Sequence, residues 1–204
     1  MIELKDFTIS IPTDEHISFS QEIENLLKEA ATEKSRGLNI KNSDYIAKKI
    51  KNGDAIIALH EGELAGFCYL RRRKQADYVS ISGIVIIPKY RKSGLSNLII
   101  NEAFALARSK YPQAKIFSLT TSPTFMQANS KLGYKPVNYS KLSTSVEFWN
   151  ACSDCLNYET LKANNYSRCL CTASLFNPYN FNIEDEYELN ELSVDKAAKK
   201  NNRM

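Results

Sequence analysis

The most constraining feature of this chain is a strand, a short turn and a helix that follow one another without a linker. The β-branched run 84–87 stops at Pro88, and a basic turn containing Gly94 leads straight into an apolar-striped segment, 97–110. Backbone N–H groups at such a turn, together with the positive end of the helix dipole, attract phosphate. The glycine lets the backbone approach a ligand closely. The sequence therefore predicts a turn that binds a phosphate or pyrophosphate group.

Two well-known phosphate-binding motifs do not describe this turn. It lacks the Gly-Lys-Ser/Thr ending of a P-loop and the three glycines of a dinucleotide-binding fingerprint. An ordinary helix N-terminus with solvated basic side chains remains an alternative, although the basic pair at 91–92 adds positive charge where phosphate would bind. The residues expected to contact the phosphate are Arg91, Lys92, Ser93, Gly94, Leu95 and Ser96.

Apolar periodicity divides most of the chain into strands and helices. Strands are predicted at residues 7–11, 54–60, 65–72, 78–87 and 115–121. Helices are predicted from a capping box at Ser18 and Gln21, from Ser43 as the cap to Gly53, over residues 95–109, and from Pro123. With a further strand after the last helix, the order β-α-α-β-β-β-α-β-α-β indicates an α/β (α+β) chain.

Two segments resemble the motifs of a known family. Arg91-x-x-Gly94-x-Ser96, after 85–88, resembles motif A of the GNAT (Gcn5-related) N-acetyltransferases, in which Gly or Ala usually stands where this chain has Ser96. The segment 125–135 is similar to the motif B helix and its Leu-Gly-Tyr exit. The resemblance covers about residues 7–140 and implies the GNAT fold, a mixed central sheet flanked by helices.

The same resemblance implies an acyl-CoA-dependent N-acyltransferase. The pantetheine arm of CoA is expected along Ile84, Val85 and Ile86, with its pyrophosphate on the 91–96 turn. Backbone N–H groups of that strand are expected to serve both the arm and the thioester oxygen.

The acid and the base of the reaction are less well defined by the sequence. Many GNAT relatives have a tyrosine, the acid for the thiolate, where this chain has Asn129. An amide has no titratable proton, so Asn129 can donate a hydrogen bond but cannot be the general acid, and it is expected at the catalytic site as a residue that also binds the cofactor. Tyr134 or a water molecule is then the candidate acid, and a core position is the alternative for Tyr134. Ser82, His60 and Glu61 are the candidates for the base, and none stands out.

Four of the five cysteines form two close pairs after the resembling region. Cys152-x-x-Cys155 and Cys169-x-Cys171 are separated by thirteen residues, which gives the ligand count of a tetrahedral zinc site. A structural zinc ion is therefore predicted, with inert buried thiols and redox chemistry as alternatives. The expected organisation is a GNAT domain at 1–145, a cysteine-containing extension packed on it at 146–180, and a flexible polar tail at 181–204.

The extension also narrows the resemblance. Trp149-x-x-Cys152-x-x-Cys155 is similar to the tail of short glutamate N-acetyltransferases, which begin arginine biosynthesis. This implies glutamate or a similar amino acid as the acceptor, and acetyl-CoA or succinyl-CoA as the donor. Arg36 and Arg71 are the candidates for binding its carboxylates. Transfer to protein lysines or N-termini, and a non-catalytic CoA-binding module, remain alternatives.

Composition sets the remaining expectations. An apolar fraction of 43% and a charged fraction of 25% are ordinary for a soluble globular protein of 204 residues. A net charge of +4 suits an anionic cofactor better than nucleic acid. Neither a signal peptide nor an apolar run of about 20 residues is visible, so a cytoplasmic protein with free or metal-bound thiols is expected. The expected partners are CoA and a small substrate, without nucleic acid or membrane, and a homodimer is left open.

Overall fold

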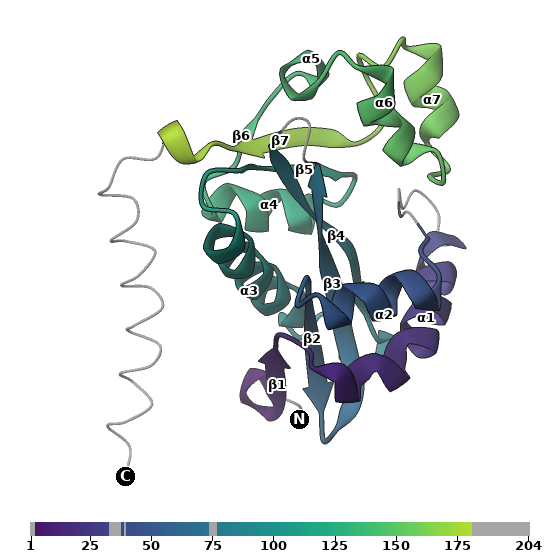
Figure 1. Ribbon diagram of the computed structural model, residues 1–204, viewed down its shortest axis with the longest axis vertical. Helices are drawn as coiled ribbons and strands as arrows, with labels where there is room; N and C mark the ends of the chain where they lie inside the picture. Colours follow the sequence, from purple (N-terminus) through teal and green to yellow (C-terminus); the bar gives the residue numbers. More distant parts are fainter. Residues whose placement is uncertain (1–2, 33–37, 39, 74–76, 181–204) are drawn as a thin grey trace.

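The protein is built on a mixed sheet with helices on both faces (Figure 1). The structure, a computed structural model, describes residues 3–32, 38, 40–73 and 77–180. Within these residues the strand order is β1-β2-β3-β4-β5-β7-β6. The pairing is antiparallel except between β4 and β5, which run parallel. The predicted α/β architecture with a mixed central sheet is therefore confirmed.

The elements lie close to their predicted positions. The strands are β1 (Phe7–Ser10), β2 (Ala55–His60), β3 (Glu63–Arg73), β4 (Tyr78–Ile86), β5 (Lys115–Thr120), β6 (Lys135–Pro136) and β7 (Thr172–Phe176). The α-helices are α1 (Ser20–Thr32), α2 (Ser43–Lys51), α3 (Leu95–Lys110), α4 (Pro123–Lys131), α5 (Tyr139–Leu142), α6 (Val146–Trp149) and α7 (Tyr158–Ala163). Short 3-10 helices are η1 (Leu4–Asp6), η2 (Asp14–Phe19), η4 (Pro88–Tyr90), η5 (Asn150–Cys152) and η6 (Pro178–Asn180).

The starts of the first two helices differ from the prediction. The capping box does not involve Ser18, because the chain first forms η2, whose box pairs Thr13 with His16. The cap of α2 is Asn42 rather than Ser43, with an Asn42 side chain that accepts the Tyr45 N–H at 3.0 Å. In both places an earlier polar residue in extended conformation takes the capping role.

Both faces of β3 are buried, which explains its unbroken apolar run. Cys68 and Leu70 pack in the cluster shared with α3, whereas Phe67 and Tyr69 pack in the cluster shared with α1 and α2. Alternate side chains of a strand point to opposite faces, so a strand covered on both sides needs apolar residues at every position. Cys68 is fully buried and its thiol pKa is raised to about 12, in keeping with a core residue.

The parallel strands β4 and β5 are paired only at one end. Their register joins residues 78–80 of β4 to residues 115–117 of β5, whereas β4 continues to pair with β3 as far as Ile86. The edge of β4 beyond Ser80 therefore has no strand partner on its β5 side. The two strands diverge there and leave an opening in the sheet.

A bulge in β4 lies beside this opening. The β3–β4 register shifts between Phe67 and Tyr69, and Gly83 on the bulged strand has a φ of +62°. A Cβ at Gly83 would lie 2.3 Å from Cε1 of the Tyr69 ring. Both the backbone conformation and the lack of space therefore require glycine at this position.

The cysteine-bearing segment takes part in the sheet. Its strand β7 lies between β5 and β6, antiparallel to both, with Thr172 opposite Thr120 and Phe176 opposite Ile116. A third apolar cluster surrounds Trp149, which is fully buried, stacks on another ring and donates its indole N–H to a backbone carbonyl at 3.0 Å. The sheet thus continues past residue 145, and the division into domains stays a prediction.

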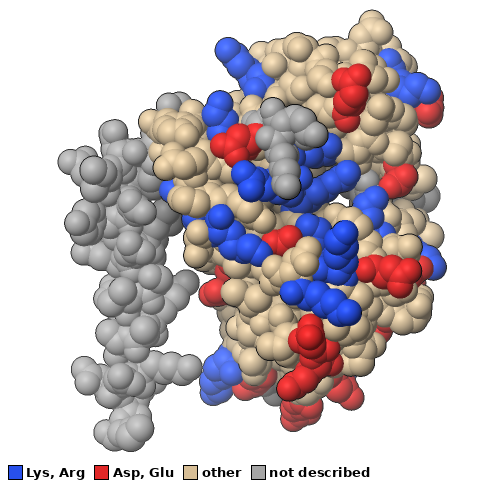
Figure 2. Space-filling view, viewed as in Figure 1, with Lys and Arg blue, Asp and Glu red and all other residues tan. Residues whose placement is uncertain are grey.

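The surface of the described part carries both signs of charge. Lys and Arg side chains form a band across the middle of the face seen in Figure 2, with Asp and Glu among them and toward the lower end. Within the described residues, no helix combines the length and the apolar composition needed to cross a membrane.

Candidate functional site

A cavity of about 670 Å³ occupies the opening between β4 and β5. This volume lies in the usual range for a ligand-binding site. Most of its lining comes from β3, the divergent halves of β4 and β5, the turn before α3, helix α4, and the segment that carries the cysteines. The cavity therefore joins the predicted phosphate-binding turn to the predicted acceptor and cysteine residues.

The three residues of β4 that were predicted to bind the cofactor do not all face the cavity. Ile84 and Ile86 line the cavity. Val85 is buried in the core shared with α1 and α2, because successive side chains of a strand alternate between faces. Val85 can therefore offer a ligand only its backbone.

The turn before α3 presents most of its predicted residues to the cavity. Lys92 and Gly94 have φ values of +65° and +89°, which fold the backbone back toward the start of α3. Ser93 instead holds the turn together, because its hydroxyl donates to the Tyr90 carbonyl at 2.7 Å and accepts the Leu95 N–H at 3.3 Å. The lining residues of the turn are Arg91, Lys92, Gly94, Leu95, Ser96 and Asn97.

Asn129 and Tyr134 both line the cavity, and both are almost fully buried. The Tyr134 ring packs against Phe104 and Phe176, yet its hydroxyl has no hydrogen-bond partner among the described residues. Burial raises the pKa of Tyr134 far above its usual value, so the phenol stays protonated at neutral pH. The cavity thus contains a protonated hydroxyl group that donates no hydrogen bond to the described residues.

The candidate bases are placed differently from one another. Ser82 lines the cavity, with its Oγ 3.0 Å from the Oγ of Ser80. His60 lies elsewhere, packed against the rings of Phe7 and Tyr90 at 5.4 and 5.2 Å, and Glu61 is exposed in the β2–β3 turn. Of the described residues that line the cavity, none is His, Asp or Glu. Serine and threonine hydroxyl groups line the cavity instead.

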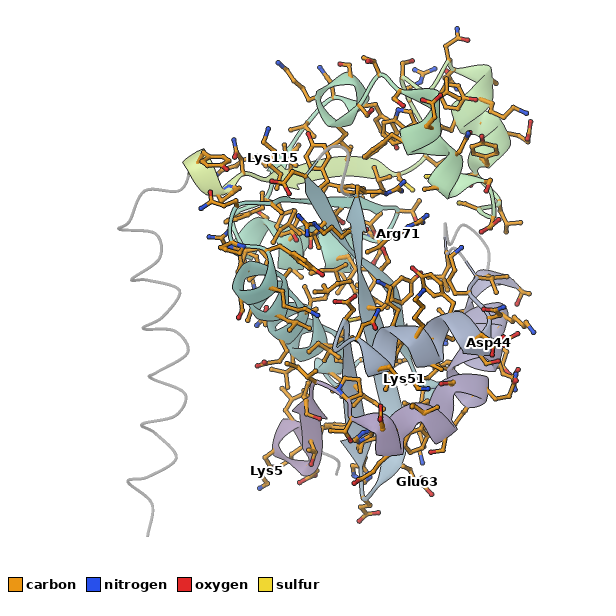
Figure 3. All side chains as sticks on the ribbon, viewed as in Figure 1. Lys5, Asp44, Lys51, Glu63, Arg71 and Lys115 are labelled. Carbon is orange, nitrogen blue, oxygen red and sulfur yellow. The ribbon has the colours of Figure 1, made fainter. Side chains whose placement is uncertain are left out.

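Two arginines on β3 line the cavity near the extension. Arg71, labelled in Figure 3, and Arg73 stand on the same face of the strand, since they are two residues apart. Arg71 donates to the Ala151 carbonyl at 3.4 Å, and Arg73 donates to the Phe148 carbonyl at 3.0 Å. Neither forms an ion pair with a carboxylate of the described residues. Arg36, the other predicted substrate-binding residue, lies outside the described part of the chain.

All four paired cysteines line the extension end of the cavity as free thiols. Burial raises the pKa of Cys152 to about 11 and that of Cys171 to about 12, so these thiols are protonated at neutral pH. Among the residues that the structure describes, no group of three or more His, Cys, Asp or Glu side chains is placed to hold a metal ion. Four thiols are a suitable donor set for zinc, but they are not assembled into a site, and zinc stays a prediction for metal analysis of the purified protein.

Sequence reasoning missed three residues that shape the cavity. Arg73 could have been found, because it repeats the strand-period spacing of Arg71. Gly83 could also have been found, since a glycine inside a strand pattern indicates a bulge. No pattern in the sequence identifies Asn157 as a site residue, because its place in the cavity wall depends on how the extension folds.

The comparison with family models decides the family. Residues 21–130, more than half of the chain, match the model described as the Acetyltransferase (GNAT) family. The chain belongs to this family. The GNAT resemblance of its two motifs is thereby confirmed, and residues 21–130 form an acetyltransferase domain of this family. A search of curated proteins gave no match.

Structures of GNAT proteins share the fold. The N-acetylglutamate synthase of Neisseria gonorrhoeae, solved with coenzyme A and N-acetyl-glutamate, aligns with a TM-score of 0.59 and 16% identity over 84% of this chain and 35% of its own. Rv2747 of Mycobacterium tuberculosis, solved with CoA, aligns with a TM-score of 0.58 and 14% identity over 83% of this chain and 98% of its own. The diaminobutyrate acetyltransferase EctA of Paenibacillus lautus, solved with its substrate and coenzyme A, aligns with a TM-score of 0.55 and 10% identity over 87% of this chain and 98% of its own. The chain thus spans about a third of the gonococcal enzyme, and these likenesses concern the fold.

Proposed function

We propose that this GNAT protein transfers an acyl group from acyl-CoA to the amine of a small amino acid that carries a carboxylate. Glutamate is the first acceptor to test, with arginine biosynthesis as the corresponding pathway, and acetyl-CoA or succinyl-CoA as the donor. The observation that supports this most is the cavity, which connects the turn before α3 to Tyr134 and Arg71 without interruption. The gonococcal synthase and EctA, which share the fold, have amino acids or their acetylated product in their solved complexes.

The divergence of β4 from β5 offers a place for the donor. Backbone groups of β4 beyond Ser80 have no strand partner on the cavity side, so an extended arm that carries amides can pair with them as an added strand would. The pantetheine arm would lie along Ile84, Val85 and Ile86, with the pyrophosphate at the 91–96 turn. Asn129 would bind the cofactor with its side-chain amide.

The chemistry requires one proton to leave the amine and one to reach the sulfur. The neutral amine attacks the thioester carbon, a C–N bond forms, and the C–S bond breaks with its electron pair on sulfur. The Tyr134 hydroxyl gives its proton to that sulfur, and water, positioned with Ser82, takes the proton from the amine. Tyr134 then regains a proton from water, so the products are an amide and free CoA thiol.

Arg71 is the proposed partner for a carboxylate of the acceptor. It faces the cavity from β3, opposite Ser80 in the register and close to the point where β4 and β5 part. Its guanidinium donates one hydrogen bond at 3.4 Å to a backbone carbonyl, which leaves donors for a bidentate carboxylate.

We expect Arg71→Ala to raise the KM for the amino-acid acceptor about 10- to 100-fold, because a charge-assisted hydrogen bond to the carboxylate is lost. Steady-state kinetics at saturating acyl-CoA measure this. Arg72→Ala is the matched control, because Arg72 lies outside the cavity lining and pairs with Asp77 at 3.6 Å. Equal KM values for the two variants would remove Arg71 from the acceptor site.

We expect Gly94→Leu to weaken CoA binding about tenfold or more, because the side chain obstructs the approach of pyrophosphate to the turn. Calorimetric titration with CoA measures it. Gly94→Ala is the control, because it has the same backbone strain at a φ of +89° but a much smaller side chain. Its Cβ would make an ordinary contact of 3.5 Å with Leu4. A Leu variant that binds CoA as well as the Ala variant would refute this placement of the pyrophosphate.

The test of the proposed function is acceptor-dependent release of CoA thiol. Purified protein is mixed with acetyl-CoA or succinyl-CoA and, separately, with glutamate, other amino acids and a lysine-containing peptide. Release with amino acids, and with glutamate above all, supports the proposal. Release with the peptide alone would point to a protein acceptor, and CoA binding without any release would point to a non-catalytic module.

A further inference from the structure

Two unpaired buried donors belong to the wall of the cavity. Among the described residues, three buried side-chain atoms have no hydrogen-bond partner: Arg73 Nε, Asn157 Nδ2 and Ser20 Oγ. The first two belong to residues that line the cavity, and Ser20 does not. Folded proteins rarely leave buried donors unpaired, because each costs free energy. Two such donors in one cavity indicate a ligand that would satisfy them.

Arg73 contributes a positive charge as well as a donor. Its guanidinium lies 4.9 Å from the centre of the Phe148 ring and donates to the Phe148 carbonyl, so the side chain is fixed in place. Burial lowers its pKa to about 10, which still leaves it charged at neutral pH. A half-buried cation without a described carboxylate partner favours an anionic ligand.

Two of the cysteines hold the backbone of Asn157 in the wall of the cavity that Arg73 also lines. The Asn157 N–H donates to Cys155 Sγ at 3.4 Å, and its carbonyl accepts from Cys169 Sγ at 3.5 Å. Arg73, Asn157 and the four paired cysteines therefore belong to the wall of one cavity. The Asn157 side chain is 8% exposed, and its amide torsion is soft enough to turn toward a ligand.

The register orders these groups along the cavity. On β3, Tyr69 lies opposite Ser82, Arg71 opposite Ser80 and Arg73 opposite Tyr78, so Arg73 is one strand repeat beyond Arg71, away from the turn before α3. Two residues of a strand span about 7 Å, which is the scale of a small amino acid. An acceptor bound by Arg71 would therefore extend its side chain toward Arg73.

The geometry points to a specificity subsite formed by Arg73 and Asn157, which binds a carboxylate on the side chain of the acceptor. This inference rests on the proposed function and adds the residues that would select a dicarboxylic amino acid over other amino acids. The cysteine extension would also contribute to substrate specificity, because the thiols of its loops hold the Asn157 backbone in the cavity wall.

The test compares three acceptors of similar length: L-glutamate, L-glutamine and L-norvaline. We expect kcat/KM to fall in that order for the wild-type protein. Asn157→Leu should reduce the preference for glutamate over norvaline about 10-fold, and Arg73→Gln about 100-fold, with CoA affinity unchanged in both. Ser20→Ala, which removes the unpaired atom outside the cavity, should leave the preference unchanged.

The outcomes separate this inference from the proposed function. A wild-type protein that acylates no amino acid would overturn both. A wild-type protein that acylates amino acids, with variants that slow all three acceptors equally or none, would overturn the subsite alone. Thermal unfolding gives a readout without turnover: Asn157→Leu should raise the Tm of the ligand-free protein, because an unpaired buried amide is removed. A lowered Tm would mean that the amide serves the fold, and would overturn the subsite.

Discussion

Tyr134→Phe should lower kcat about 10²- to 10³-fold, because the departing thiolate loses its proton donor. The phenol lines the cavity, its hydroxyl has no hydrogen-bond partner among the described residues, and its raised pKa keeps it protonated throughout the working pH range. The removed oxygen supports no part of the described fold, so stability and CoA affinity should stay near the wild-type values. Single-turnover measurements of CoA thiol release determine the rate of the chemical step.

Tyr78→Phe is the matched control for this variant. Tyr78 is also buried, but it lies outside the cavity lining, and its hydroxyl donates to the Lys141 carbonyl at 3.2 Å. Its loss should cost about 1 kcal/mol of unfolding free energy and leave kcat unchanged. A Tyr134→Phe protein that turns over as fast as Tyr78→Phe would show that water supplies the proton.

Gly83→Ala should lower the free energy of unfolding by about 2 to 4 kcal/mol. Two costs combine: a left-handed φ of +62°, and a Cβ only 2.3 Å from the ring of Tyr69. Tyr69 is 1% exposed, so the ring has no space into which it can move. Urea unfolding followed by circular dichroism measures the loss, and the bulge beside the cavity should be distorted with it.

Gly62→Ala separates these two costs. Gly62 has a φ of +83°, but a Cβ there would meet nothing within 4 Å. Its substitution should cost only about 1 kcal/mol from backbone strain. Equal losses at the two positions would mean that the Tyr69 ring does not confine Gly83.

The strand, turn and helix before α4 could be predicted because their signals are local. Pro88 and Gly94 mark the turn, and apolar spacing marks α3, so the sequence places these elements within a residue or two. The details that failed were the helix starts, where Asn42 and Thr13 took the capping roles expected of neighbouring residues. Several polar residues compete for each cap, and sequence spacing alone does not choose between them.

The acceptor end of the cavity could not be predicted in the same way. It depends on β7 entering the sheet between β5 and β6, a pairing between segments more than fifty residues apart along the chain. That packing brings Asn157 and the cysteines into the wall of the cavity that Arg71 and Arg73 also line. The four cysteines predict a metal site by their count and spacing, but the sequence did not predict that they would line the cavity.

The most direct measurement follows the acyl group itself. Acetyl-CoA labelled in its acetyl carbonyl carbon is incubated with the protein and L-glutamate, and the label is located by nuclear magnetic resonance. We predict that it appears in an amide bond to the glutamate nitrogen, with one CoA thiol released for each amide formed. Label that remains in acetyl-CoA, while the protein binds CoA, would contradict the account.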